Sequence, residues 1–262
     1  MNVKTHHIFL KPMPLLKIAC NKESLSPESL WLLKNNINGY KDIESNELST
    51  QAISGRNFKI LPDPNLGSSN KKQKRIKVLL LEDGYICWFN LEDLVDQIQK
   101  IDYWNPKFLT KNQINSKLSK VLIWIEKASK SPNHYLWGGT TGPNFDCSGL
   151  IQTAFSSESI WIPRDAYQQE QFCKRIEFNI NTLDQLIPGD LLFFGYKKKC
   201  THVGIYKDNG EYWHSSGKKD GRDGIGIDSL SSINKNAISS HYLSILRGAG
   251  RVESCHNGRS LL

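Results

Sequence analysis

A cysteine and two histidines are the residues of this chain whose types and spacing point to covalent chemistry. Cys147 follows a loop rich in glycine, residues 135–146, and precedes apolar residues at helical spacing. We therefore expect Cys147 to lie at a helix N-terminus, where unpaired N–H groups and the helix dipole favour a thiolate. A thiolate, unlike a thiol, is a strong nucleophile, so this placement suits covalent catalysis.

The two histidines follow on segments that we expect to form a hairpin. Apolar alternation in residues 201–206 predicts a strand with His202 at its entrance. The turn signal at residues 208–210 then predicts a second strand, which carries His214 and brings it beside His202. We interpret Cys147 as the nucleophile, His202 as the general base, and His214 as the polar group that orients the imidazole.

Three short motifs, taken together, resemble those of the NlpC/P60 cysteine peptidases. They are Asp-Cys-Ser-Gly at 146–149, Thr-His-Val-Gly at 201–204 and His-Ser-Ser at 214–216. Other stretches are similar to one branch, the bacterial γ-D-glutamyl-L-diamino acid endopeptidases with an N-terminal SH3-like domain, especially the cyanobacterial type. These stretches are residues 135–140, 163–169, 188–190 and 221–228. The resemblance covers residues 112–252.

The resemblance implies an α+β chain in which a small SH3-like β-barrel precedes a papain-like peptidase domain. Short strand signals between polar turns favour such a barrel, and an apolar stripe after residue 112 predicts a helix. The expected divisions are an N-terminal extension at 1–35, the SH3-like domain at 36–98, a linker at 99–111, the peptidase domain at 112–252 and a C-terminal tail at 253–262.

The resemblance also implies a substrate, a murein tripeptide or tetrapeptide that begins with free L-Ala and is cut between γ-D-Glu and diaminopimelate or Lys. Asp146 is expected to hold an ammonium group of this peptide. Arg164 either grips a substrate carboxylate through two hydrogen bonds or forms an internal ion pair with Asp165 or another acid. The substrate-binding candidates are Asp146, Ser148, Arg164, Asp165, Glu82, Tyr85 and Ser215.

Tyr135 is the fourth catalytic candidate, beside Cys147, His202 and His214. Its hydroxyl either lies near the developing oxyanion, together with the backbone N–H of Cys147, or packs as an aromatic group under the loop. The three other residues also have structural interpretations as a buried cysteine and buried histidines. We favour catalytic roles because all the motifs occur in one chain.

Composition and charge narrow the classes of partner and cofactor. The chain has 34 Lys and Arg against 26 Asp and Glu, for a net charge of +8, but no long basic face that would indicate nucleic acid. Its six cysteines lack zinc-ribbon spacing and a disulfide framework, so we expect reduced thiols, no metal and no cofactor. With no clean signal peptide and no membrane span, we expect a cytoplasmic enzyme of peptidoglycan recycling.

Two other functions remain compatible with the same residues. A Cys–His acyltransferase or another amidase would use the same pair, because transfer differs from hydrolysis only in what resolves the thioester. A wall-binding module without catalysis is the third hypothesis, and the intact Cys147, His202 and His214 argue against it. The sequence does not indicate an oligomeric state.

Overall fold

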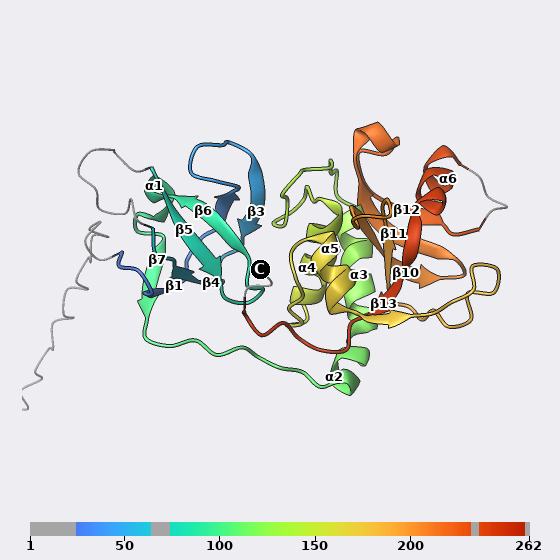
Figure 1. Cartoon of the computed structure of the whole chain (residues 1–262), viewed down its shortest axis with the longest axis horizontal. Coiled ribbons are helices and arrows are strands. Elements are labelled where there is room, and N and C mark those ends of the chain that lie inside the picture. The colour runs from blue at the N-terminus through green and yellow to red at the C-terminus, as the bar shows by residue number, and fades with distance from the viewer. Residues whose placement is uncertain (1–24, 64–73, 232–235, 260–262) are drawn as a thin grey trace, which may run out of the picture.

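The computed structural model describes residues 25–63, 74–231 and 236–259, which form two sheet-containing parts (Figure 1). The first part is a seven-stranded antiparallel sheet in the order β3-β2-β6-β5-β4-β1-β7. Its elements are β1 (Leu30–Leu33), β2 (Ile37–Tyr40), β3 (Leu48–Ala52), β4 (Asn57–Ile60), β5 (Arg75–Leu80), β6 (Ile86–Asn90), α1 (Leu91–Leu94) and β7 (Ile98–Ile101).

The closed SH3-like barrel expected from the sequence is not confirmed. Among the described strands, no pairing joins the edge strands β3 and β7. The sheet also extends beyond the predicted 36–98 at both ends, since β1 and β7 pair with each other. Alternate side chains of β1, Trp31 and Leu33, point into the core, and this pattern explains its place in the sheet. Residues 1–24 of the predicted extension and 260–262 of the tail lie outside the described residues.

The second part combines helices with a six-stranded antiparallel sheet in the order β12-β11-β10-β9-β13-β8. Its helices are α2 (Lys111–Asn115), α3 (Leu118–Ser129), α4 (Cys147–Ser156), α5 (Ala166–Phe172), η2 (Lys218–Asp220) and α6 (Ala237–Ser244). Its strands are β8 (Lys174–Ile176), β9 (Leu191–Phe194), β10 (His202–Asp208), β11 (Glu211–Ser216), β12 (Gly224–Ser229) and β13 (Leu246–Arg251). The structure thus confirms a mixed α/β fold.

Side-chain alternation along the central strand β9 explains why both faces of this sheet are covered. Leu191 and Phe193 pack into the cluster with α3 and α4, whereas Leu192 and Phe194 pack into a second cluster that includes Tyr242 of α6. Helices α3, α4 and α5 consequently lie between the two sheets (Figure 1). The start of α4 is thereby held between its own sheet and the first part.

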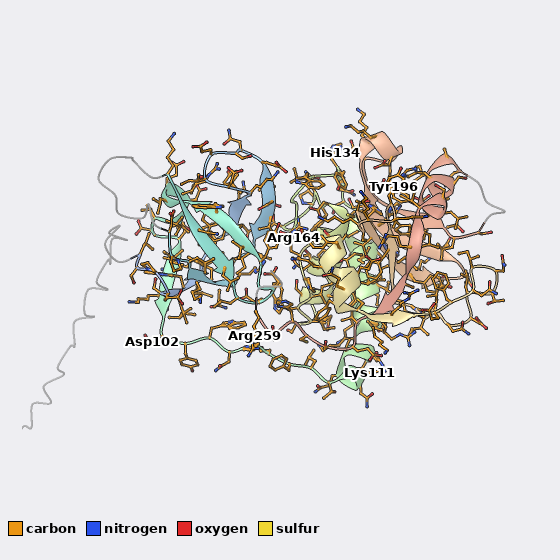
Figure 2. All side chains as sticks on the ribbon, in the orientation of Figure 1. Asp102, Lys111, His134, Arg164, Tyr196 and Arg259 are labelled. Atoms are coloured by element: carbon orange, nitrogen blue, oxygen red, sulfur yellow. The ribbon has the colours of Figure 1, made fainter. Side chains whose placement is uncertain are left out.

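Polar contacts join the two parts directly. The Gln51 side-chain oxygen accepts a hydrogen bond from the backbone N–H of Thr140 at 3.1 Å, and Arg164 Nε donates to Thr50 Oγ1 at 3.1 Å. Gln152 of α4 donates to Asp83 at 2.8 Å. Figure 2 shows Arg164 where the two parts meet. Because these contacts tie the first part to the glycine-rich loop, to Arg164 and to α4, the first part forms one side of the region around Cys147.

Candidate active site

Cys147 is the first residue of α4, as the sequence predicts, and Asp146 is the N-cap. The Asp146 carboxylate accepts hydrogen bonds from the backbone N–H of Gly149 at 2.6 Å and of Gly138 at 2.8 Å. The bond from Gly149 satisfies a backbone N–H of the first helical turn that has no partner within the helix. The bond from Gly138 links the glycine-rich loop to the start of α4. Cys147 itself is buried.

The loop and the helix approach each other too closely for a side chain at Gly149. A Cβ there would lie 2.1 Å from the carbonyl oxygen of Gly139. A Cβ at Gly217 would make only ordinary contacts, the nearest at 3.5 Å. Glycine at position 149 therefore fixes the distance between the loop and the nucleophile.

We expect Gly149→Ala to lower the free energy of unfolding by about 1–3 kcal/mol, because the added Cβ overlaps a backbone carbonyl oxygen, which cannot rotate away as a side chain can. Thermal melting followed by circular dichroism measures this loss, and Gly217→Ala is the matched control. Equal melting temperatures for the two variants would show that the loop yields without cost.

The predicted hairpin is confirmed, and it brings the two histidines together. Asn209 and Gly210 have φ values of 48° and 80°, the left-handed conformation that two-residue hairpin turns require. His202 begins β10, and Nε2 of His202 lies 2.8 Å from Nδ1 of His214 on β11. The ring planes stand at 89°.

The Cys147 thiol lies beside the start of β10. The backbone N–H groups of Val203, the residue after His202, and of Ser148 hydrogen-bond the Cys147 thiol. Because His214 occupies Nε2 of His202, Nδ1 is the ring nitrogen left for the thiol. The structure thus brings Cys147, His202 and His214 together, and their catalytic roles stay a prediction.

Burial keeps the resting pair neutral. It raises the pKa of the Cys147 thiol to about 12, and the Asp146 carboxylate acts in the same direction, while the backbone donors oppose it. Burial also lowers the pKa of His202 well below its ordinary value. The helix N-terminus therefore does not by itself produce the thiolate that the sequence led us to expect.

Tyr135 lies near the thiol. Burial raises the pKa of its hydroxyl above the ordinary range, and the neighbouring Cys147 adds to the shift. The hydroxyl consequently remains a hydrogen-bond donor at neutral pH. This state fits the predicted contribution to an oxyanion site, and the backbone bridge between Tyr135 and Phe145 holds the residue in the loop.

Three of the predicted substrate residues are instead engaged inside the protein. Arg164 is 1% exposed and its guanidinium pairs with Asp146 at 2.5 Å, which is the internal ion pair that the sequence left open. Ser148 Oγ accepts from Arg164 Nη1 at 3.0 Å. A carboxylate and a guanidinium that share buried hydrogen bonds neutralise each other, and any contact of these residues with substrate stays a prediction.

Glu82 and Ser215 are likewise engaged. Glu82 accepts from the backbone N–H of Asn57 at 2.7 Å and from Arg56 Nε at 3.2 Å. Ser215 donates to the carbonyl oxygen of Phe145 at 2.7 Å. Sequence alone did not reveal these internal partners, and a substrate contact of either residue stays a prediction.

Asp165 and Tyr85 are the predicted substrate residues that stay partly exposed and come together. Burial raises the pKa of Asp165, and burial together with Asp165 raises the pKa of the Tyr85 hydroxyl above its ordinary range. Asp165 is the N-cap of α5, whereas Tyr85 precedes β6 in the first part. Asp165 of the second part and Tyr85 of the first part thus lie near each other and near Arg164.

Asp228 is a polar residue of the site to which the sequence assigned no role. Its Oδ2 lies 2.7 Å from Nε2 of His214, and both side chains are fully buried. One signal for Asp228 was present in the sequence, because it lies in the stretch 221–228 that resembles the family. In the structure, buried and partly exposed residues alternate along β12, and Asp228 is one of the buried residues.

Residues 132–247 match the model of the NlpC/P60 family. They form an NlpC/P60 domain. This domain contains Cys147, His202 and His214.

Curated relatives match about a third of the chain. Over 84 residues the chain is 43% identical to a Bacillus subtilis γ-D-glutamyl-L-lysine dipeptidyl-peptidase, covering 31% of this chain and 27% of the relative. Over 86 residues it is 43% identical to the B. subtilis bifunctional muramidase/DL-endopeptidase CwlT, covering 31% and 25%. It is 35% identical over 88 residues to a probable endopeptidase NlpC of Escherichia coli, covering 32% and 54%. The matches thus span about a quarter of the first two relatives.

A solved structure of an NlpC/P60 family protein from Bacillus cereus superposes with a TM-score of 0.41 and 20% identity, covering 89% of this chain and 67% of the other.

The part of the chain that the structure describes shows neither a cluster of metal ligands nor a membrane-spanning helix. Within residues 25–63, 74–231 and 236–259, no three His, Cys, Asp or Glu side chains are grouped as metal ligands. No helix in these ranges has the length and apolar character needed to cross a membrane. The five cysteines in these ranges are free thiols.

Proposed function

We propose that this chain is a cysteine endopeptidase that hydrolyses the γ-D-glutamyl–diamino acid bond of murein peptides with a free N-terminal L-Ala. The observation that carries the proposal is the meeting of Cys147, at the start of α4, with the hydrogen-bonded pair of His202 and His214. The names of the relatives, a γ-D-glutamyl-L-lysine dipeptidyl-peptidase and a DL-endopeptidase, support the bond.

The proposed reaction is two-step acyl transfer to water. Nδ1 of His202 takes the proton of Cys147 as the sulfur attacks the γ-carbonyl carbon of D-Glu. The Tyr135 hydroxyl and the backbone N–H of Cys147 stabilise the oxyanion. The His202 imidazolium then protonates the leaving amine, and water, deprotonated by His202, hydrolyses the thioester.

The proposed recognition of the free N-terminus uses the predicted acid that is partly exposed and pairs with no arginine in the described residues. The carboxylates of Asp146 and Glu82 already pair with Arg164 and Arg56. Asp165, partly exposed beside Tyr85, remains to hold the ammonium group of L-Ala. We further propose that the first part is an SH3-like domain that walls this side of a papain-like cleft.

Blocking the substrate amine is expected to reduce turnover. N-acetylation of L-Ala-γ-D-Glu-diaminopimelate leaves Asp165 without its partner, which costs about 1–3 kcal/mol and lowers kcat/KM by about 5- to 150-fold. Chromatographic rates for the free and acetylated tripeptides measure the difference. In Asp165→Asn, the ratio of the two rates should shrink. Equal rates in the wild type would refute free-amine recognition.

The requirement for a free amine leads to a proposed place of action. Peptides of the intact wall have their L-Ala nitrogen in an amide bond, whereas a peptide that has been cleaved from its sugar presents it as a free amine. We therefore propose cytoplasmic recycling of released peptides. Incubation with insoluble peptidoglycan should release no product under conditions in which the free tripeptide is consumed, and efficient release from the wall would contradict this role.

A further inference from the structure

We propose that Asp228 is a positioning residue for the reaction. Through its hydrogen bond to His214, Asp228 determines which ring nitrogen His202 presents to Cys147. This inference rests on the proposed function only in that Cys147 and His202 carry the chemistry. It concerns the free enzyme, so it is testable without knowing the substrate.

An unbroken chain of hydrogen bonds leads from Asp228 to His202. Oδ2 of Asp228 lies 2.7 Å from Nε2 of His214, and Nδ1 of His214 lies 2.8 Å from Nε2 of His202. An ionised carboxylate only accepts hydrogen bonds, so Nε2 of His214 carries the proton. In the neutral ring Nδ1 is then an acceptor, and Nε2 of His202 must donate to it. Nδ1 of His202 is left unprotonated, as a base for the thiol requires.

Asp228 is surrounded by donors from separate elements. Its Oδ2 also accepts from Arg222 Nη2 at 2.6 Å, and its Oδ1 accepts from Ser239 Oγ at 2.8 Å and from Asn236 Nδ2 at 3.2 Å. Burial raises the pKa of Asp228, but the hydrogen bonds from His214 and Arg222 outweigh burial and hold the pKa below its ordinary value. The residue is therefore ionised at neutral pH.

The backbone is shaped to hold the arginine in place. Gly226 lies opposite His214 in the β11–β12 register. A Cβ at Gly226 would lie 2.1 Å from Arg222 Nη1. The guanidinium therefore crosses the strand at Gly226, where no side chain is in its way, and there it reaches Asp228.

Other titratable groups near the histidines do not hydrogen-bond them. The Tyr242 ring stacks on His202 with centroids 4.3 Å apart, and the Tyr212 ring centroid lies 5.1 Å from that of His214. Asp220 of η2 lies 4.0 Å from His241 of α6, and both are partly exposed. Asp220 acts on His214 only through its charge. Asp220→Asn is consequently a matched control that removes a nearby negative charge without breaking the chain.

The direction in which Asp228→Asn should change the reactivity of Cys147 follows from the charge that the substitution removes. A carboxylate beside an imidazole favours the imidazolium, so Asp228→Asn lowers the pKa of the histidine pair. Proton transfer from Cys147 to His202 then becomes less favourable. We expect alkylation of Cys147 by iodoacetamide to slow by about tenfold or more at neutral pH, from a shift of about one pKa unit or more. The rates should converge in alkali, where hydroxide removes the thiol proton.

The experiment measures alkylation of Cys147 against pH by mass spectrometry in the full chain, for the wild type, Asp228→Asn and Asp220→Asn. Circular dichroism verifies that each variant is folded. The proposal expects a deficit at neutral pH in Asp228→Asn that disappears in alkali, and a smaller deficit in Asp220→Asn. Wild-type rates for Asp228→Asn at every pH, or a deficit that persists unchanged in alkali, would overturn it.

A second measurement needs no change at Asp228. Nitrogen-15 spectra of histidine-labelled wild type, assigned with His214→Gln, report which ring nitrogens carry protons. Protons on Nε2 of both His214 and His202 are expected, and a proton on Nδ1 of His214 would overturn the inference. Because neither experiment uses a peptide, a tripeptide that is not cleaved would refute the proposed substrate and leave the role of Asp228 standing.

Discussion

Replacing Cys147 with alanine is expected to reduce tripeptide hydrolysis by at least about 10⁴-fold, because loss of the nucleophile removes the acyl-enzyme route altogether. The methyl group fits the buried space of the thiol, so the start of α4 should persist. Chromatography of L-Ala-γ-D-Glu-diaminopimelate digests measures the loss, and circular dichroism confirms the fold.

A second buried thiol provides the control for this variant. Cys173, the C-cap of α5, is also buried and free. Cys173→Ala should retain hydrolysis within a few-fold, because its sulfur has no part in the proposed reaction. Hydrolysis that survives in Cys147→Ala, or is lost equally in Cys173→Ala, would remove the distinction between the two thiols.

Arg164→Met is expected to lower the free energy of unfolding by about 3–5 kcal/mol, because it leaves the Asp146 carboxylate in the interior without its cation. The guanidinium is 1% exposed and also reaches Thr50 of the first part, so the loss affects the joint between the two parts. Urea denaturation followed by tryptophan fluorescence measures the change.

Arg175 supplies the matched control for this variant. It pairs with Glu177 at 2.8 Å, but the two side chains are 78% and 82% exposed. Water screens such a pair, so Arg175→Met should change stability by less than about 1 kcal/mol. If Arg164 instead gripped the substrate, Arg164→Met would raise KM and leave the unfolding curve where it is.

The local features of the site were predictable because short stretches determine them. Asn209-Gly210 adopts left-handed angles more easily than other pairs, and this fixes the hairpin that aligns His202 with His214. The N-cap Asp146 and the apolar spacing after it place the helix start at Cys147. In both cases residues within one turn or one strand decide the structure.

The partners of charged side chains were not predictable, since they depend on distant segments. Arg164 pairs with Asp146 rather than with its neighbour Asp165, and Glu82 is held by Arg56 from a segment distant in the sequence. A carboxylate that looks available in a motif is thus already satisfied in the fold. Closure of the first sheet into a barrel was not predictable either, because the sequence of a strand does not reveal whether the edge strands β3 and β7 pair.

The most direct test of the central claim is detection of the acyl-enzyme. The enzyme is mixed with L-Ala-γ-D-Glu-diaminopimelate, quenched in acid during turnover, digested and analysed by tandem mass spectrometry. The account predicts an L-Ala-γ-D-Glu acyl group on the sulfur of Cys147 and none in Cys147→Ala. Hydrolysis with no adduct on Cys147, together with equal hydrolysis by Cys147→Ala, would contradict nucleophilic catalysis by this residue.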